Sequence, residues 1–459
     1  MIRRVTEDEG RWLKLIGIGV ALIIGGILVA LMIARARMNR SVETQLNAIR
    51  AAKLPTNRRE LGEWHAPVPD NENAALVLTQ AFGLMRTYTD ARSNEVSQIR
   101  VPTRGKSLSP KERDLIAGYV ELNADALALA RKALALPKCR YPMDSSNDLV
   151  TLPYHLFELK PLVRICQLRA YLANDRKESD AAADWIDVML GLARTLDEEP
   201  AIISQLVRIA TIKLSVQTLE SALAREAMSD ARLVKLATTI ASLRRTNSLQ
   251  RALIGERATA IPYFRLSSSE IDHLAQQWAG NISPSSATPS SRGPSPFLKL
   301  TGILERDLNF YLKAMSTNIQ IVGLGPPTSL ALSNVNDQLV REAKSRLYIL
   351  SGLSLGALSR ITIREAEVLA ALNVAHTALA IERFRGVHGR LPRELLEIVP
   401  DFLPQLALDP FDGALLRHKI TEKGYVVYSV GLDGQDDGGA VRSSGSTAAP
   451  QDITFTVER

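Results

Sequence analysis

The stretch LIGIGVALIIGGILVALMIA, from Leu15 to Ala34, holds no charged residue and lies between Lys14 and Arg35. As a helix, these 20 residues rise about 30 Å, which is the thickness of the hydrocarbon core of a bilayer. A cleaved signal peptide has a shorter apolar region, typically about 7–15 residues. The sequence therefore predicts a retained single-pass transmembrane helix over residues 15–34, a short cytoplasmic N-terminus over residues 1–14, and the lipid bilayer as a partner.

Basic residues lie on both sides of this span, so charge alone does not decide its orientation. A domain that follows such a span can cross the membrane largely regardless of its charge. The basic residues before the span are Arg3, Arg4, Arg11 and Lys14, and those after it are Arg35, Arg37, Arg40, Arg50 and Lys53.

Small residues recur every fourth position within the span, at Gly17, Ala21 and Gly25. Such a face lets a second membrane helix approach closely, which would permit helix–helix self-association. Glycine is also common in membrane helices in general, so the pattern has two interpretations, and both stay open.

The overall composition is that of a folded, mainly helical protein. Apolar residues make up 46% of the 459 residues and aromatic residues only 5%, with Ala and Leu dominant, a balance that favours helices packed on helices. The formal net charge of +7 is spread along the chain, without a basic block interleaved with aromatic residues. We therefore expect no binding of nucleic acid.

The region after the span shows helical periodicity. Trp185, Met189, Leu192 and Leu196 are spaced by 4, 3 and 4 residues, which places them on one face of a helix. The sequence predicts an irregular α-helical hairpin domain over residues 42–355, in which the Ser/Pro-rich segment 283–296 forms a flexible linker. The expected helices lie near residues 112–136, 155–173, 180–196, 201–224 and 230–246.

The sequence contains no recognisable catalytic or metal-binding motif in its central region. None of the histidines lies three or four residues from another, and the sequence contains neither HExxH nor a G-x-S-x-G motif. Cys166 lies on an apolar helical face and is expected in the core, although a disulfide with Cys139 stays open. The histidines are His65, His155, His273, His376, His388 and His418.

The pattern changes from residue 361 onward. A long helix is expected first, and then two short strands, ALLRHKI (residues 414–420) and YVVYSV (residues 425–430), joined by a turn. The run ITFTV (residues 453–457) alternates apolar and polar residues and predicts a third strand. The sequence therefore predicts a small α+β module with a short antiparallel sheet over residues 361–459.

Four motifs in this module occur in a characteristic order. They are HGRLP (residues 388–392), DPFDGALL (residues 409–416), YSVGLDGQDDGG (residues 428–439) and the pair Asp452–Ile453. In this order they resemble the globular domain of the major pseudopilin of type II secretion, over about the last fifth of the chain. The resemblance implies a pseudopilin-like helix followed by a β-meander, a calcium-binding loop, and an association with an envelope secretion system.

The acidic loop is the candidate metal site. Calcium takes six to eight oxygen ligands, so closely spaced carboxylates among glycines suit it. The candidate ligands are Asp433, Asp436 and Asp437, and the resemblance adds Asp452 through the late Asp–Ile pair. An EF-hand is excluded, because its twelfth position would be Ser444 and strands precede the loop. The alternative is that the aspartates and glycines only form a solvated hairpin loop.

The lead hypothesis is a structural or interaction protein anchored in the bacterial inner membrane, with its bulk in the periplasm. Its expected partners are proteins, among them envelope secretion or pilus-type components, and calcium is its expected structural cofactor. No catalytic residue is predicted. The alternatives are an envelope hydrolase with a site between helices, and a membrane-anchored helical scaffold or sensor that binds a peptide partner.

Overall fold

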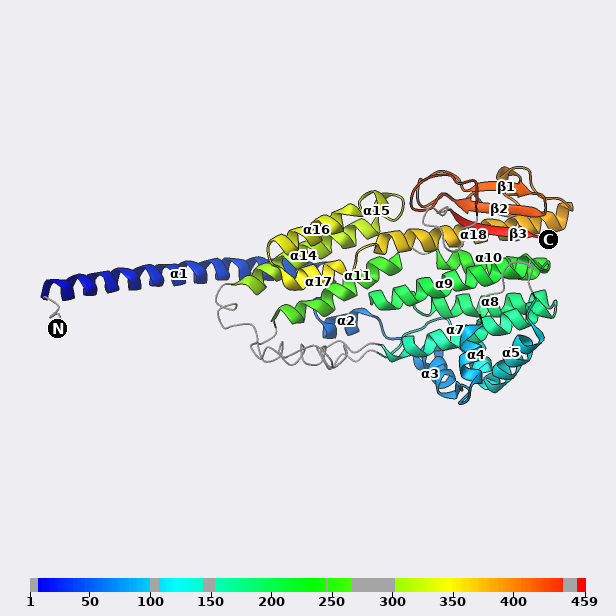
Figure 1. Ribbon diagram of the computed structural model, residues 1–459, viewed down its shortest axis with the longest axis horizontal. Helices are drawn as coiled ribbons and strands as arrows, with labels where there is room; N and C mark the ends of the chain where they lie inside the picture. The colour runs from blue at the N-terminus through cyan, green and yellow to red at the C-terminus, as the bar shows by residue number, and fades with distance from the viewer. Residues whose placement is uncertain (1–6, 100–106, 143–152, 245–246, 266–301, 441–451) are drawn as a thin grey trace, which may run out of the picture. The chain divides into compact units, whose positions relative to one another are not determined.

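The computed structural model describes residues 7–99, 107–142, 153–244, 247–265, 302–440 and 452–459 (Figure 1). Helix accounts for 69% of the chain and strand for 6%, so the predicted mainly helical class is confirmed. The Ser/Pro-rich segment 283–296 lies outside the described residues.

The chain divides into two compact units. Unit 1 consists of Met1–Leu61, Arg257–Thr317 and Val335–Ser359. Unit 2 consists of Gly62–Glu256, Asn318–Asn334 and Arg360–Arg459.

A single long helix, α1 (Glu7–Ala51), contains the whole predicted span. It is long and apolar enough to cross a membrane, and its apolar stretch is not buried within the structure. Leu22 and Met32 are 71% and 70% exposed. A Cβ atom added at Gly17 or Gly25 would meet no other atom within 4 Å, so self-association through this face stays a prediction.

Beyond its apolar stretch, α1 becomes part of the core of unit 1. Val42, Leu46 and Ile49 are buried, at the spacing of one helical face. The first part of α14 (Ile303–Gly323) packs along this region, where Arg35 donates to Glu305 over 2.7 Å. The other helices of unit 1 are η2 (Ile261–Arg265), α16 (Asn334–Ser345) and α17 (Ile349–Gly356). The division between the units falls within α2 (Arg58–Trp64) and within α11 (Asn247–Ala260).

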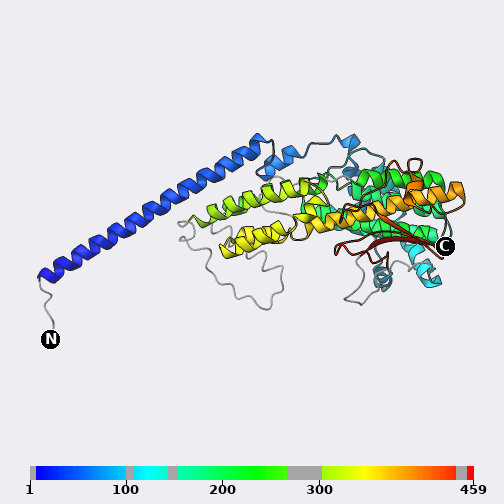
Figure 2. The ribbon, with the colours of Figure 1, turned by 90° about the horizontal axis from the view of Figure 1, so that it is seen from above.

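Unit 2 is built on a stack of long helices. α7, α8 and α9 lie side by side, and α10 and α18 lie against α8 and α9 (Figures 1 and 2). The expected segments 155–173, 180–196, 201–224 and 230–246 correspond to α7 (Tyr154–Asp175), α8 (Ser179–Arg194), α9 (Ile202–Leu223) and α10 (Asp230–Leu243). The remaining elements before the sheet are η1 (Asp70–Glu72), α3 (Ala74–Leu84), α4 (Arg92–Gln98), α5 (Pro110–Leu122), α6 (Ala124–Leu134), α15 (Thr328–Ala331), α18 (Ile361–His388) and η3 (Leu395–Ile398).

The prediction of one helical segment over residues 112–136 is wrong in one respect. The segment forms two helices, α5 and α6, which are separated at Asn123. The side chain of Asn123 donates to the carbonyl of Arg86 over 3.0 Å and accepts from its N–H over 2.9 Å. An asparagine that bonds the backbone of another segment in this way competes with the helix it interrupts. The periodicity of the apolar residues gives no sign of this contact.

The C-terminal sheet has the predicted three antiparallel strands, in the order β1 (Arg417–Thr421), β2 (Gly424–Ser429) and β3 (Ile453–Glu458). Every residue of β2 is buried, and the sheet packs on α18, where the hydroxyl of Tyr425 donates to the carbonyl of Ala378 over 3.2 Å. Gly424 is required by the pairing of β2 with β3, since a Cβ atom there would lie 1.9 Å from the carbonyl oxygen of Val457.

The central helix α9 carries a buried ion pair. Arg208 is 4% exposed and donates both to Asp197, which is 7% exposed, and to the carbonyl of Leu243 over 2.9 Å. A charge removed from water requires such partners, because its desolvation is costly.

The Arg208→Ala variant is expected to lower the free energy of unfolding by about 3–5 kcal/mol, because it removes the guanidinium from a buried carboxylate. The measurement is urea unfolding of the full chain in detergent. The matched control is Lys213→Ala, whose pair with Glu367 involves side chains that are 38% and 30% exposed. A pair with this exposure contributes at most about 1 kcal/mol, so similar losses in the two variants would contradict the prediction.

Candidate functional site

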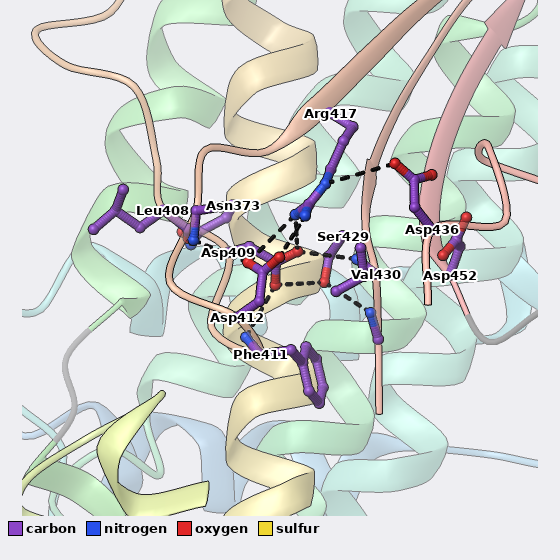
Figure 3. Close-up of polar contacts among 12 residues, drawn as sticks. Asn373, Leu408, Asp409, Phe411, Asp412, Arg417, Ser429, Val430, Asp436 and Asp452 are labelled. Atoms are coloured by element: carbon purple, nitrogen blue, oxygen red, sulfur yellow. Dashed lines mark hydrogen bonds and ion pairs between the residues drawn. The ribbon is translucent and has the colours of Figure 1, made fainter. Parts of the chain in front are cut away.

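The structural centre of the C-terminal module is the carboxylate of Asp409, which is fully buried (Figure 3). One of its oxygens accepts from the hydroxyl of Ser429 over 2.8 Å and from the N–H of Phe411 over 3.0 Å. The other accepts from the N–H of Val430 and from the guanidinium of Arg417, both over 2.9 Å. Each oxygen thus accepts two hydrogen bonds, so the buried carboxylate is fully satisfied at this position.

Arg417 connects this centre to the acidic loop. It pairs with Asp409 and with Asp412 of the same DPFDG turn, and its Nε lies 4.0 Å from a carboxylate oxygen of Asp436 (Figure 3). Its hydrogen bond holds the pKa of Asp412 below the ordinary value. One guanidinium thus joins the turn before β1 to the loop after β2.

Within the loop, two aspartate side chains accept hydrogen bonds from backbone N–H groups of the loop itself. Asp433 accepts from the N–H of Gln435 over 3.2 Å, and Asp436 accepts from the N–H of Gly438 over 2.9 Å. These contacts two residues ahead are the turns expected of aspartate among glycines.

Asp452 closes the loop from the start of β3. One of its carboxylate oxygens accepts from the N–H of Gly439 over 2.9 Å, and the other is buried without a hydrogen-bond partner among the described residues. Burial raises the pKa of Asp452, and the nearby charges of Asp437 and Asp436 raise it further. Burial also raises the pKa of Tyr428 to about 12, together with a hydrogen bond to Asp436.

The structure therefore brings Asp436, Asp437 and Asp452 into one negative cluster, whereas Asp433 acts mainly within its own turn. An unpartnered carboxylate oxygen beside two further carboxylates fits the donor set of a calcium ion. Among the residues that the structure describes, however, no three acidic, histidine or cysteine side chains converge closely enough to hold a metal ion. The calcium site remains a prediction, with Asp452 as its central ligand.

Unit 2 also contains a cavity of about 610 Å³ between α6, α8 and the segment before α3. Its lining combines apolar side chains with His65, Cys139, Arg194 and Arg251. Arg251 lies 4.2 Å from the centre of the Trp64 ring and 3.3 Å from Glu198. A volume of this size is in the range of small-molecule sites.

The polar groups of this cavity are not poised for nucleophilic catalysis. Burial raises the pKa of the Cys139 thiol to about 12 and lowers the pKa of His65 to about 4. The thiol is therefore protonated at neutral pH and the imidazole is neutral, whereas a nucleophilic cysteine requires a thiolate. Cys139 and Cys166 are both free, which resolves the open question of a disulfide.

Two residues of the module, Asp409 and Arg417, were absent from the predicted site. The DPFDG motif contributes to the pseudopilin resemblance, but nothing in it indicates that its first aspartate is buried or that an arginine eight residues later reaches the acidic loop. The cavity was not predicted either, because its lining residues come from segments far apart in the sequence.

No family model, no curated protein and no solved structure matches this chain. The fold and the site define a helical protein with a helix that could cross a membrane and a small α+β module at its C-terminus.

The Asp409→Asn variant is expected to destabilise the module by about 3 kcal/mol or more. In either orientation of the new amide, its NH2 group faces two hydrogen-bond donors, and the negative charge that faces Arg417 is lost. The measurement is thermal and urea unfolding of the full chain. The matched control is Asp433→Asn in the exposed part of the loop, with an expected effect within about 0.5 kcal/mol. Equal effects would refute the central role of Asp409.

Asp452 gives a prediction that depends on pH. Because its pKa is raised on folding, the stability that this group contributes is fully present below its unfolded pKa of about 4 and is lost as the pH rises through its folded value. The Asp452→Asn variant is therefore expected to be more stable than the wild type at neutral pH in the presence of a chelator, with an advantage that disappears toward about pH 4.

Calcium reverses this comparison. Millimolar calcium is expected to raise the melting temperature of the wild type at neutral pH and to leave that of Asp452→Asn unchanged, because the cation offsets the clustered charges. A wild-type melting temperature that does not respond to calcium would remove the calcium site, while the chelator measurement would still test the raised pKa.

Proposed function

We propose that this chain is a single-pass protein of the bacterial inner membrane whose helical units and C-terminal module lie in the periplasm. It acts there through protein–protein contacts, at a type II secretion or pilus-type envelope system. The observation that carries the proposal is α1, whose apolar stretch is exposed while its continuation is part of unit 1. Such a helix ties a folded domain directly to a bilayer.

The C-terminal module supports the role in protein contacts. Leu408 and Leu415 are opposite one another in an isolated antiparallel bridge and are 57% and 48% exposed. Adjacent exposed apolar side chains on a module held rigid by Asp409 are typical of an interaction surface. The order of the motifs in this module, which resembles that of the major pseudopilin, indicates the kind of assembly.

The acidic loop supports the periplasmic location. A structural calcium site of clustered carboxylates and backbone oxygens binds in the range found for extracellular modules, which is far weaker than cytosolic sensors require. We propose that calcium bound at Asp452, with Asp436 and Asp437 drawn toward it as the loop closes on the ion, stabilises the loop next to this surface.

The hydrolase alternative would have to use the cavity of unit 2. The thiol of Cys139 is protonated and the imidazole of His65 is neutral, so these residues support hydrolysis poorly. They are better suited to a site that binds a small ligand or a peptide.

The proposal predicts the topology of the full chain in a bacterial host. Alkaline phosphatase fused to the C-terminus is expected to be active, and a green fluorescent protein fusion dark, because the first folds only outside the cytoplasm and the second only inside. The opposite result would overturn the periplasmic location.

The interaction role is tested in the same cells with a photo-crosslinking residue at position 415. Crosslinking to a component of an envelope assembly system is expected there and not from position 422, which is exposed in the turn between β1 and β2. Equal yields from the two positions would argue against a specific surface.

A further inference from the structure

The corner between α16 and α17, residues 344–353, exposes three large apolar side chains. Leu347 is 71%, Ile349 is 70% and Leu353 is 63% exposed. Ile349 and Leu353 are four residues apart on α17 and therefore lie on one face of it. Isolated exposed leucines are ordinary, but three large apolar side chains within seven residues make an unusual concentration of exposed apolar area.

This corner is held rigidly by α14. Asp307 accepts from the N–H groups of Leu350 over 3.1 Å and Ser351 over 3.2 Å, which caps the start of α17. The rings of Phe310 and Tyr348 lie 5.4 Å apart and fix the turn from the other side. The exposed apolar residues are thus presented by a well-defined structure.

Leu347 has a left-handed backbone conformation, with φ of 58°. This region is unfavourable for a bulky L-residue, because its Cβ atom crowds the following carbonyl. This conformation ends α16, because the N–H of Leu347 donates to the carbonyl of Lys344 over 3.1 Å and that of Tyr348 to the carbonyl of Ala343 over 2.8 Å, and it leaves the Leu347 side chain in solvent.

Contacts within unit 1 place the corner next to the end of the apolar stretch of α1. Arg35, the first residue after that stretch, donates to Glu305 over 2.7 Å. A Cβ atom at Gly302 would lie 3.5 Å from the Cγ of Arg35. Asn309, one turn further along α14, contacts Ser41 over 3.1 Å and Gln45 over 2.5 Å.

Asp307 lies between Glu305 and Asn309 on α14, so the start of α17 is level with the first turns of α1 beyond Arg35. One helical turn rises about 5.4 Å. The polar headgroup layer extends several ångströms beyond the hydrocarbon core, and an amphipathic segment in it buries its apolar face by about 5–10 Å. The corner therefore lies at the height of the headgroups when α1 spans the bilayer.

The charges of the corner suit the same location. Its charged residues are Lys344 and Arg346, both exposed, and no acidic residue lies within residues 344–353. Arg346 also pairs with Glu342, one turn earlier on α16, over 2.9 Å, which leaves Lys344 as the cation without an ion pair among the described residues. Basic residues beside exposed apolar side chains are attracted to anionic headgroups.

We propose that the α16–α17 corner inserts Leu347, Ile349 and Leu353 into the interfacial layer of the same bilayer that α1 spans. The inference rests on the proposed membrane anchoring and holds for either orientation of the span. The corner is a second membrane contact, which fixes the tilt of unit 1 relative to the membrane surface.

The test uses nitroxide labels on the full chain in nanodiscs of phosphatidylcholine and phosphatidylglycerol. The label is attached at Leu353→Cys, and its collisions with oxygen and with a water-soluble nickel complex are compared. Val20→Cys reports on the span, and Lys313→Cys is the aqueous control, exposed on α14 and farther from Arg35. The unaltered chain is the labelling blank, because Cys166 is fully buried and Cys139 half-buried.

The label at position 353 is expected to lose access to the nickel complex and to gain access to oxygen relative to position 313, while position 20 is deeper than both. Adding Ile349→Asp is expected to return the label at position 353 to water, because the carboxylate replaces buried apolar area and is repelled by the anionic phosphatidylglycerol headgroups.

Three outcomes are distinguishable from this result. If position 20 is deep but position 353 matches position 313, the inference is wrong and the anchor stands. If position 20 itself is aqueous, the proposed anchoring fails. If position 353 is shielded from both reagents, protein rather than lipid covers the corner, and the inference is again overturned.

Discussion

The exposed apolar stretch of α1 is the constraint on which the arrangement of unit 1 depends. A backbone in hydrocarbon has no water to bond and must satisfy its hydrogen bonds internally, which a continuous helix does. The same helix continues to Ala51 without a break, so its last turns carry the contacts of Arg35, Ser41 and Gln45 with α14. In the proposed anchoring, a domain built on this helix is held close to the membrane surface, and its exposed apolar corner faces that surface.

The C-terminal module depends on a different interaction, the buried carboxylate of Asp409. Its four hydrogen bonds join the DPFDG turn, the end of β2 and the guanidinium of Arg417. Through Arg417 the same centre reaches the acidic loop, so the geometry of the proposed calcium site is connected to the core of the module. A loop of glycines and aspartates would otherwise have little to hold it, since glycine loses more conformational freedom on folding than other residues.

Prediction from the sequence succeeded where structure is local and failed where it depends on contacts between distant segments. The helices α7 to α10 and the three strands follow from apolar spacing, which reports the period of each element. The break at Asn123 was missed, because it results from hydrogen bonds to Arg86. Of the predicted ligands, Asp436, Asp437 and Asp452 share one electrostatic environment, whereas Asp433 bonds its own turn. Spacing alone does not separate Asp433 from Asp436 and Asp437, since each of these three is followed by a glycine or another aspartate.

The sequence by itself determined the elements of this protein: an apolar helix long enough for a bilayer, a set of amphipathic helices, and a short sheet with an acidic loop. Each of these follows from the periodicity and composition of a continuous segment, because a helix or strand buries a repeating set of neighbours. Only the tertiary structure decided that Asp409 is buried against Arg417, that the cavity joins His65 to Arg251, and that Asp307 of α14 caps the start of α17. Such pairs are set by packing between segments that are far apart in the chain, and no local pattern encodes them.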